Sequence, residues 1–199
     1  MNPDEAVAFP AVNVALKGGR SATLRLLDRS DGEALASFYA VVPPEDFRFY
    51  CPHPLTRPEA LKKAASADDS CFVCLVGVAE KGDIAGYAWY RWQADDSPSS
   101  GFGICIRRDF QGSGLARALM ADLLKIAARV GPPVMRLTVQ KANPRAVALY
   151  RKMGFTAVRE QVREFDNEPE YCMERKVKAR PPGLGLAPVS PEMSRRMRS

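Results

Sequence analysis

The residue types best suited to bind an anion lie in one short segment between an apolar run and a helical pattern. That segment reads Gln111, Gly112, Ser113, Gly114, Leu115, Ala116 and Arg117. The run at residues 102–106 is typical of a strand and the pattern at residues 115–130 of a helix. The first turn of a helix leaves N–H groups without intrahelical acceptors, and glycines let an anion approach them closely. The segment therefore predicts a site for phosphate groups, although such turns also occur without a ligand.

A second pair of residues with chemical potential lies on a later helix. Asn143 stands at its expected N-cap and Pro144 at its first position, which is an ordinary helix start. Tyr150 follows Asn143 by about two turns, so both side chains lie on one face of the helix. A tyrosine in this place is either a core aromatic or a phenol, of pKa about 10, that donates a proton in a site.

Together, the two segments resemble the GNAT superfamily of acetyl-CoA-dependent N-acetyltransferases. Gln111, Gly114 and Ala116 match the family's diphosphate turn, Gln/Arg-x-x-Gly-x-Gly/Ala. The residues that match the family's later helix are Asn143, Ala146, Leu149, Tyr150, Gly154 and Phe155. The order and separation of the two motifs also match. The resemblance is firm over residues 84–160, looser over residues 23–78, and covers neither end of the chain.

The resemblance implies an α+β fold in which a mixed, mostly antiparallel central sheet is flanked by helices. Acetyl-CoA, the expected cosubstrate, would lie in a V-shaped gap between the strand at residues 102–106 and the next parallel strand. The main chain of Ile104 and Ile106, on either side of Cys105, would bind the pantetheine arm. The diphosphate would be held by the N–H groups of Gly112, Ser113, Gly114, Leu115, Ala116 and Arg117.

The resemblance also assigns roles to the later helix and leaves two arginines open. Asn143 would hydrogen bond the cofactor arm from the other side, and Tyr150 would point its hydroxyl at the thioester sulfur. Arg107 and Arg108 are equally well explained as phosphate contacts or as solvated residues at a strand end.

The acceptor amine must lose a proton, and here the chain departs from its relatives. Many GNAT enzymes carry a glutamate where this chain has Gly101, and others carry one where it has Thr138. Neither residue can act as a general base. The sequence leaves three alternatives, namely a water chain, a loop carboxylate, or His53, whose usual pKa of about 6.5 suits a base. The loop carboxylates are Asp95, Asp96, Glu164, Asp166, Glu168 and Glu170.

Composition narrows the class of protein further. The 199 residues carry a net charge of +6, of which the last 21 residues hold four arginines and one glutamate, 4 − 1 = +3. The remaining +3 suits a polyanionic ligand, and we consider nucleic acid an unlikely partner. No secretory signal or membrane-spanning run is present in the sequence, which favours a cytoplasmic location.

Other motifs argue against metal and nucleotide chemistry. Cys71 and Cys74 are three residues apart in a strand-like run, so their thiols point to opposite faces, and no metal site is expected. The five cysteines are odd in number and favour buried thiols over disulfides. No Gly-Lys-Ser/Thr follows the glycine turn, which excludes a Walker site.

Several elements must position these residues within one domain. We expect a flexible segment over residues 1–21, a domain over residues 22–178 and a Pro/Gly/Arg-rich tail over residues 179–199. Periodicity predicts helices at residues 31–41, capped by Ser30 or Asp31, and at residues 58–67, 115–130 and 143–153. Strands are predicted at residues 23–26, 71–78, 84–90, 102–106, 135–139, 156–160 and 170–177.

The resulting hypothesis is an enzyme that transfers acetyl directly from acetyl-CoA to a primary amine. The acceptor stays open between a protein lysine, a protein N-terminus and a small amine. A homodimer is a candidate assembly of the chain. Two alternatives remain. The missing carboxylates favour a CoA-binding sensor or scaffold, and the basic tail favours a toxin-like acetyltransferase of aminoacyl-tRNA.

Overall fold

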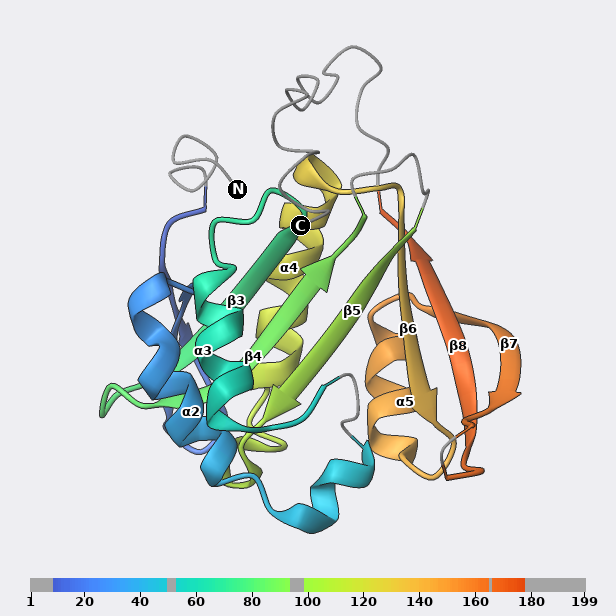
Figure 1. Cartoon of the computed structure of the whole chain (residues 1–199), viewed down its shortest axis with the longest axis horizontal. Helices are drawn as coiled ribbons and strands as arrows, with labels where there is room; N and C mark the ends of the chain where they lie inside the picture. The colour runs from blue at the N-terminus through green and yellow to red at the C-terminus, as the bar shows by residue number, and fades with distance from the viewer. Residues whose placement is uncertain (1–8, 50–52, 94–98, 165, 178–199) are drawn as a thin grey trace, which may run out of the picture.

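The computed structural model describes residues 9–49, 53–93, 99–164 and 166–177 (Figure 1). Asp95, Asp96, Cys51 and the tail at residues 179–199, for which the sequence raised expectations, lie outside them. The strands are β1 (Val12–Ala15), β2 (Ser21–Leu26), β3 (Phe72–Ala79), β4 (Ile84–Arg91), β5 (Ser99–Ile106), β6 (Val134–Gln140), β7 (Thr156–Val162) and β8 (Pro169–Lys176). The helices are η1 (Arg29–Asp31), α2 (Gly32–Ala40), η2 (Pro44–Phe49), α3 (Arg57–Ala65), η3 (Arg108–Phe110), α4 (Leu115–Val130) and α5 (Pro144–Lys152).

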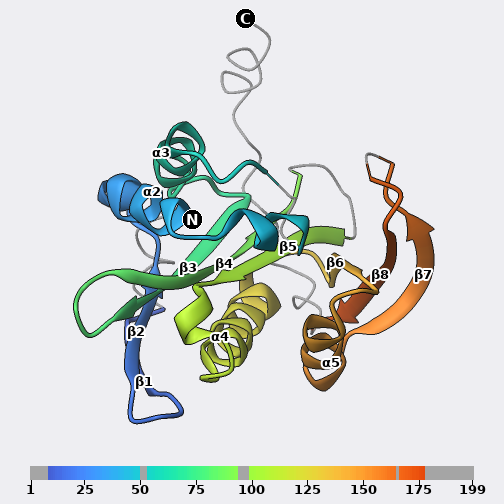
Figure 2. The same cartoon turned by 90° about the horizontal axis from the view of Figure 1, so that it is seen from below.

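The strands form one sheet in the order β1-β2-β3-β4-β5-β6-β8-β7. All neighbouring strands are antiparallel except β5 and β6, which are parallel. Helices α2 and α3 cover one face, and α4 and α5 lie on the other (Figure 2). The mixed, mostly antiparallel sheet predicted from the sequence is therefore confirmed.

Helix α4 shows why the strand-to-helix region folds as its sequence predicts. Its buried residues recur every three or four positions and form one continuous apolar stripe. They are Leu115, Leu119, Met120, Leu123, Leu124, Ile126 and Ala127. This stripe packs on β3, β4 and β5, so the start of α4 is fixed directly beyond the end of β5.

The parallel pair separates soon after it begins. Residues 99–101 of β5 pair with residues 134–136 of β6, and no later pairing joins the two strands. Beyond Gly101 the strands diverge toward their carboxyl ends, as Figure 1 shows. The sheet thus contains the V-shaped gap that the family resemblance implies.

The structure differs from the sequence-based expectation within residues 1–21. Residues Val12–Ala15 form β1, which pairs along β2 from Val12 opposite Leu24 to Ala15 opposite Ser21. Three of the four β1 residues are exposed, so the strand has no apolar alternation that could reveal it. Its stability comes from main-chain pairing, which leaves no signature in side-chain pattern.

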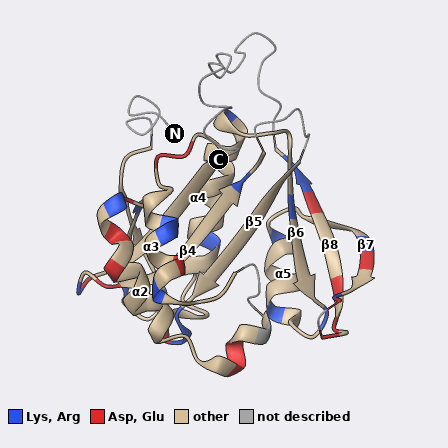
Figure 3. Ribbon diagram, viewed as in Figure 1, with Lys and Arg blue, Asp and Glu red and all other residues tan. Residues whose placement is uncertain are grey.

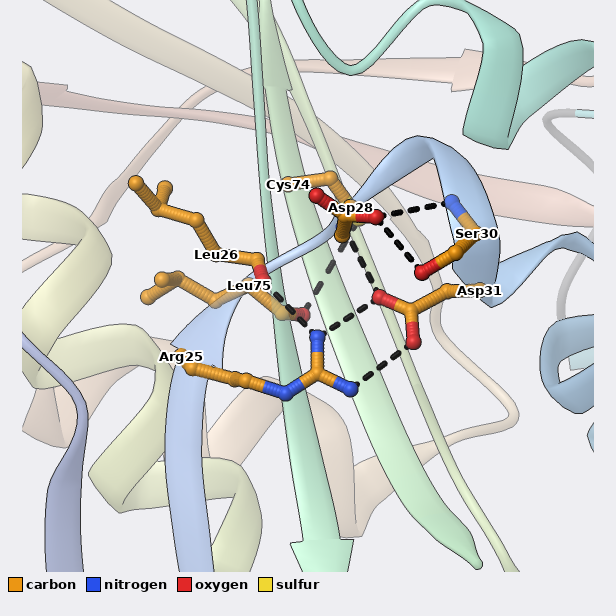
Figure 4. Close-up of polar contacts among 7 residues, drawn as sticks. All are labelled: Arg25, Leu26, Asp28, Ser30, Asp31, Cys74 and Leu75. Carbon is orange, nitrogen blue, oxygen red and sulfur yellow. Dashed lines mark hydrogen bonds and ion pairs between the residues drawn. The ribbon is translucent and has the colours of Figure 1, made fainter. Parts of the chain in front are cut away.

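Asp31 stands at the N-cap position of α2, as one of the two expected residues, but its side chain makes no capping hydrogen bond to that helix. A 3-10 turn, η1, precedes the helix, and Asp28 caps it by accepting a hydrogen bond from the Ser30 N–H at 2.8 Å. Asp31 is buried instead and accepts two hydrogen bonds from the Arg25 guanidinium, at 2.6 and 2.8 Å (Figure 4). This ion pair fastens β2 to the start of α2.

Burial alone would raise the pKa of Asp31. Hydrogen bonds from Arg25 and from the Asp28 main chain outweigh burial, and the pKa is lowered. Asp31 is therefore ionised at neutral pH and holds Arg25 through a charge-assisted pair.

Candidate active site

The glycine turn has the backbone conformation that its sequence predicts. Gly112 and Gly114 have φ angles of 79° and 101°, in a region that residues with a Cβ rarely adopt. A Cβ at Gly112 would also lie 2.8 Å from the Arg145 guanidinium, which approaches from α5. Sequence reasoning missed Arg145, because nothing in its local pattern shows that α5 brings it against the turn.

The N–H groups of the turn divide into two sets. The Ser113 N–H donates to the Phe110 carbonyl, and the Leu115 N–H donates to the Ser113 hydroxyl, each at 3.3 Å. The other N–H groups of the turn have no acceptor among the described residues, and they belong to Gly112, Gly114, Ala116 and Arg117. This arrangement sharpens the predicted cradle, since only the second set is available to a diphosphate.

The edge of β5 that faces the gap presents alternate residues. The Arg107 N–H donates to the Ala85 carbonyl of the β4 side, so alternation directs the main chain of Cys105 to β4 and that of Ile104 and Ile106 into the gap. The Ile106 carbonyl accepts a hydrogen bond from the Gln111 side chain at 3.3 Å. Gln111 therefore ties the turn to the strand end, and Cys105 presents no main-chain group to the gap.

Tyr150 closes the gap from the β6 side. It is buried on α5, and its ring lies edge-on to Phe102 of β5, with centroids 6.2 Å apart. Burial raises the pKa of its hydroxyl, and the neighbouring Cys105 thiol adds to the effect. No described residue hydrogen bonds this hydroxyl. The phenol is therefore protonated at neutral pH and able to donate.

Asn143 lies at the open end of the gap, where β6 leads into α5. Its side-chain oxygen accepts a hydrogen bond from the Ala146 N–H at 3.1 Å, which caps the helix as predicted. The oxygen is thereby used, so a ligand would be met by the amide NH₂ group of Asn143.

The opposite face of the gap, under α2 and α3, carries no carboxylate on β5. A Cβ at Gly103 would lie 2.5 Å from the Trp89 ring, and one at Gly101 would lie 3.5 Å from it. The half-buried Trp89 indole therefore covers both glycines. Thr138 of β6 lies on this same face, because Gly101 pairs with Arg136 and side chains alternate.

His53 packs against this aromatic wall. Its Nδ1 lies 2.9 Å from the Pro54 carbonyl, so Nδ1 carries the proton and donates. Its Nε2 then accepts from the Tyr87 hydroxyl at 3.3 Å. Burial, followed by the charge of Lys63, lowers the pKa of His53. The imidazole is therefore neutral at pH 7.

Lys63 is a charged group that sequence reasoning missed on this face. Its ammonium is buried over the rings of Phe72, Trp89 and Tyr87, at 5.2, 5.3 and 5.9 Å from their centroids. Ion-pair partners for it are absent from the described residues, and burial lowers its pKa. Figure 3 shows α3 carrying positive charge here. Only the fold shows that this lysine turns inward.

The remaining predicted residues fall into place around these two faces. Arg107 binds Asp83 and Asp109, and Arg108 binds Glu45 and Asp46, so both arginines are paired with carboxylates. Asp166 pairs with Arg163. Glu170 is buried on β8 opposite Gln140, on the face of Thr138, and accepts a hydrogen bond from Gln161. The structure thus brings Glu170 to the open end of the gap, on the face covered by α2 and α3.

Within the described residues, no helix is both long enough and apolar enough to cross a membrane. The same residues contain no cluster of metal-binding side chains, and Cys71, Cys74, Cys105 and Cys172 are free thiols.

The sheet order and the splayed parallel pair are those of the fold that the family resemblance implies. Residues 35–155 match the acetyltransferase (GNAT) family, and the chain belongs to that family. The resemblance drawn from the two motifs is thereby confirmed.

Similar proteins are known by sequence and by structure. The chain is 36% identical over 80 residues to mycothiol acetyltransferase of Streptomyces bingchenggensis, covering 40% of this chain and 26% of that protein. It is 31% identical over 78 residues to the ribosomal protein bS18 alanine N-acetyltransferase of Escherichia coli, covering 39% and 51%. The chain thus spans about a quarter and about half of these relatives.

Two solved structures share the fold. The GNAT domain of PAT from S. lividans superimposes with a TM-score of 0.69 at 21% identity, covering 88% of this chain and 99% of that one. The Salmonella typhimurium protein yncA, solved with its cofactor acetyl-CoA, has a TM-score of 0.65 at 21% identity, covering 85% and 98%.

Proposed function

We propose that this protein transfers the acetyl group of acetyl-CoA to a primary amine, by direct attack of the amine on the thioester. The observation that carries the proposal is the set of N–H groups without acceptors at Gly112, Gly114, Ala116 and Arg117, set directly beside the gap between β5 and β6. These groups fit a diphosphate, and the main-chain groups of Ile104 together with the Ile106 N–H, which face the gap, fit an extended amide-containing arm.

Acetyl-CoA supplies an activated carbonyl and a thiolate leaving group. Asn143 donates its amide N–H to the arm, while Arg117 and Arg145 add positive charge near the diphosphate. The Tyr150 hydroxyl donates a hydrogen bond at the sulfur as negative charge develops there. A raised phenol pKa keeps this proton in place until transfer.

The acceptor loses its proton on the α2 and α3 face of the gap. His53 is one candidate base, because its imidazole is neutral at pH 7, and the buried Glu170 is the other. The two stand on opposite sides of this face, His53 against β4 and Glu170 on β8.

The acceptor itself is proposed only as a class, a protein lysine, a protein N-terminus or a small amine. The names of the relatives point to different acceptors, mycothiol and ribosomal protein bS18, and this chain has no carboxylate at Gly101 or Thr138. A cytoplasmic location and a homodimer belong to the proposal as well, and light scattering in solution tests the second.

The absence of a carboxylate at Gly101 and Thr138 also favours a second function, a CoA-binding sensor without turnover. Calorimetric titration with acetyl-CoA, run beside a thiol-release assay over a panel of amines, separates the two functions. Binding with turnover on at least one amine supports the transferase. Tight binding with no turnover on any amine supports the sensor, and no binding rejects both.

A further inference from the structure

The turn between β1 and β2, residues 16–20, reaches across to the glycine turn. The Lys17 N–H donates to the Ser113 carbonyl at 2.8 Å. The Arg20 guanidinium donates to the Asp109 carbonyl and lies 5.2 Å from the centroid of Phe110. Both contacts are long-range, and both fall on the main chain or ring of the segment that leads into α4.

The carbonyl that Lys17 binds has a particular place in the helix geometry. In a helix that began one residue earlier, the Ser113 carbonyl would be the acceptor four residues before the Arg117 N–H. Here the first bond of this kind is from the Ala118 N–H to the Gly114 carbonyl, at 3.1 Å. The hairpin binds the Ser113 carbonyl, and the Arg117 N–H, in the first turn of α4, has no acceptor among the described residues.

The same contact also orients the next peptide group. The Ser113 carbonyl and the Gly114 N–H belong to one trans peptide plane and point in opposite directions. Holding the carbonyl toward Lys17 therefore turns the Gly114 N–H away from the hairpin. The orientation of one N–H group in the cradle, that of Gly114, thus depends on one main-chain donor from the N-terminal hairpin.

Val14 and Leu16 of the hairpin pack against the hydrophobic core, but the Lys17 contact itself lies beside open space. A cavity of about 530 Å³ lies between the hairpin and α4, and Val14, Lys17, Ser113 and Arg117 are among its lining residues. The hydrogen bond therefore bridges the two elements beside open space, and the Lys17 side chain is not needed to fill a core position.

We propose that the β1–β2 turn is a working part of the diphosphate cradle, and that the Lys17 main-chain N–H is its positioning group. The inference rests on the proposed function, because it assigns the cradle to acetyl-CoA. It places residues 12–21 within the functional unit. Cofactor affinity then depends in part on the hydrogen bond from the Lys17 N–H to the Ser113 carbonyl.

The decisive pair of variants is Lys17→Pro and Lys17→Ala. Proline removes the N–H, whereas alanine removes the side chain and keeps the N–H. Two ligands are compared for each variant, acetyl-CoA by calorimetry and pantetheine, which lacks the diphosphate, by NMR titration. The NMR spectrum also reports whether each variant is folded.

We expect Lys17→Pro to weaken acetyl-CoA binding about tenfold, the effect of one hydrogen bond, with pantetheine binding unchanged. Lys17→Ala should bind both ligands like the unmodified protein. Equal acetyl-CoA affinity in the two variants, or an equal loss for both ligands, would overturn the inference.

If Lys17→Pro does not fold, Arg20→Met decides. It removes the second anchor and leaves the Lys17 N–H in place, and a two- to threefold loss for acetyl-CoA alone supports the proposal, while no loss rejects it. Failure of the unmodified protein to bind acetyl-CoA would instead reject the proposed function from which the inference starts.

Discussion

The two sides of the β5–β6 gap are built from different parts of the chain. On the α4 side, the groups that face a ligand are main-chain N–H groups at Gly112, Gly114, Ala116 and Arg117. The α2 and α3 side is built from side chains of separate elements, namely Trp89 from β4, His53 from the loop before α3, and Lys63 from α3.

This difference explains why a short motif predicts one side and not the other. A main-chain site needs glycines at fixed spacing, and few substitutions preserve its φ angles. A side-chain surface can change residue by residue while the sheet beneath it is retained. The proposed donor side is therefore predictable from a motif, and the proposed acceptor side is not.

The largest effect is expected from a substitution of Tyr150. Tyr150→Phe should lower kcat by about 10²- to 10⁴-fold, because the leaving sulfur loses its proton donor. Cofactor affinity should stay within about twofold, since the ring still packs on Phe102. Steady-state kinetics and calorimetry measure the two quantities, with Tyr171→Phe as the control. Unchanged turnover would return Tyr150 to a packing role.

A matched pair of glycines tests whether the donor side depends on backbone conformation. Gly114→Ala should weaken acetyl-CoA binding about ten- to thirtyfold, because a residue with a Cβ is strained at a φ of 101°. Gly82, with a φ of 87° in the β3–β4 turn, has equally open surroundings. Gly82→Ala should cost similar stability and leave binding unchanged. Equal binding losses in both variants would show a general effect of strain.

The acceptor side is tested by its pH dependence. If His53 is the base, kcat/KM rises with pH as the imidazole deprotonates, through a pKa below its usual value of about 6.5. His53→Gln should remove that rise and lower the rate about tenfold or more at pH 7. If the profile and the rate of His53→Gln match those of the unmodified protein and Glu170→Gln lowers the rate instead, Glu170 is the base.

The smallest effect concerns stability on the acceptor side. Lys63→Met should raise the free energy of unfolding by up to about 1 kcal/mol, because the charge is buried without an anionic partner. A lowered folded-state pKa means that the unfolded chain binds more protons, so stability rises with pH up to the unfolded value of about 10.4. Lys63→Met should flatten that rise in urea titrations, and the exposed Lys62→Met should not.

Local sequence was enough for most of the elements and for the proposed donor site. The apolar stripe of α4, the positive-φ glycines and the Asn143 cap all act within a few residues, so their spacing alone predicts them, and the structure agrees. The general base stayed undetermined because no motif in this chain supplies one.

Other features arose only when distant segments met. Main-chain pairing makes β1 without any apolar pattern, and the same hairpin brings Lys17 to Ser113. Arg145 meets Gly112, and Trp89 covers Gly103, through contacts between elements far apart in the chain.

The sequence by itself therefore determined most of the elements, the family and the proposed position of the anion cradle, because these depend on periodicity and on backbone preferences of neighbouring residues. The tertiary structure decided which N–H groups of the cradle stay free and which side chains face the acceptor. Those properties depend on which carbonyls and rings are brought together across the sheet, and spacing along the chain carries no record of them.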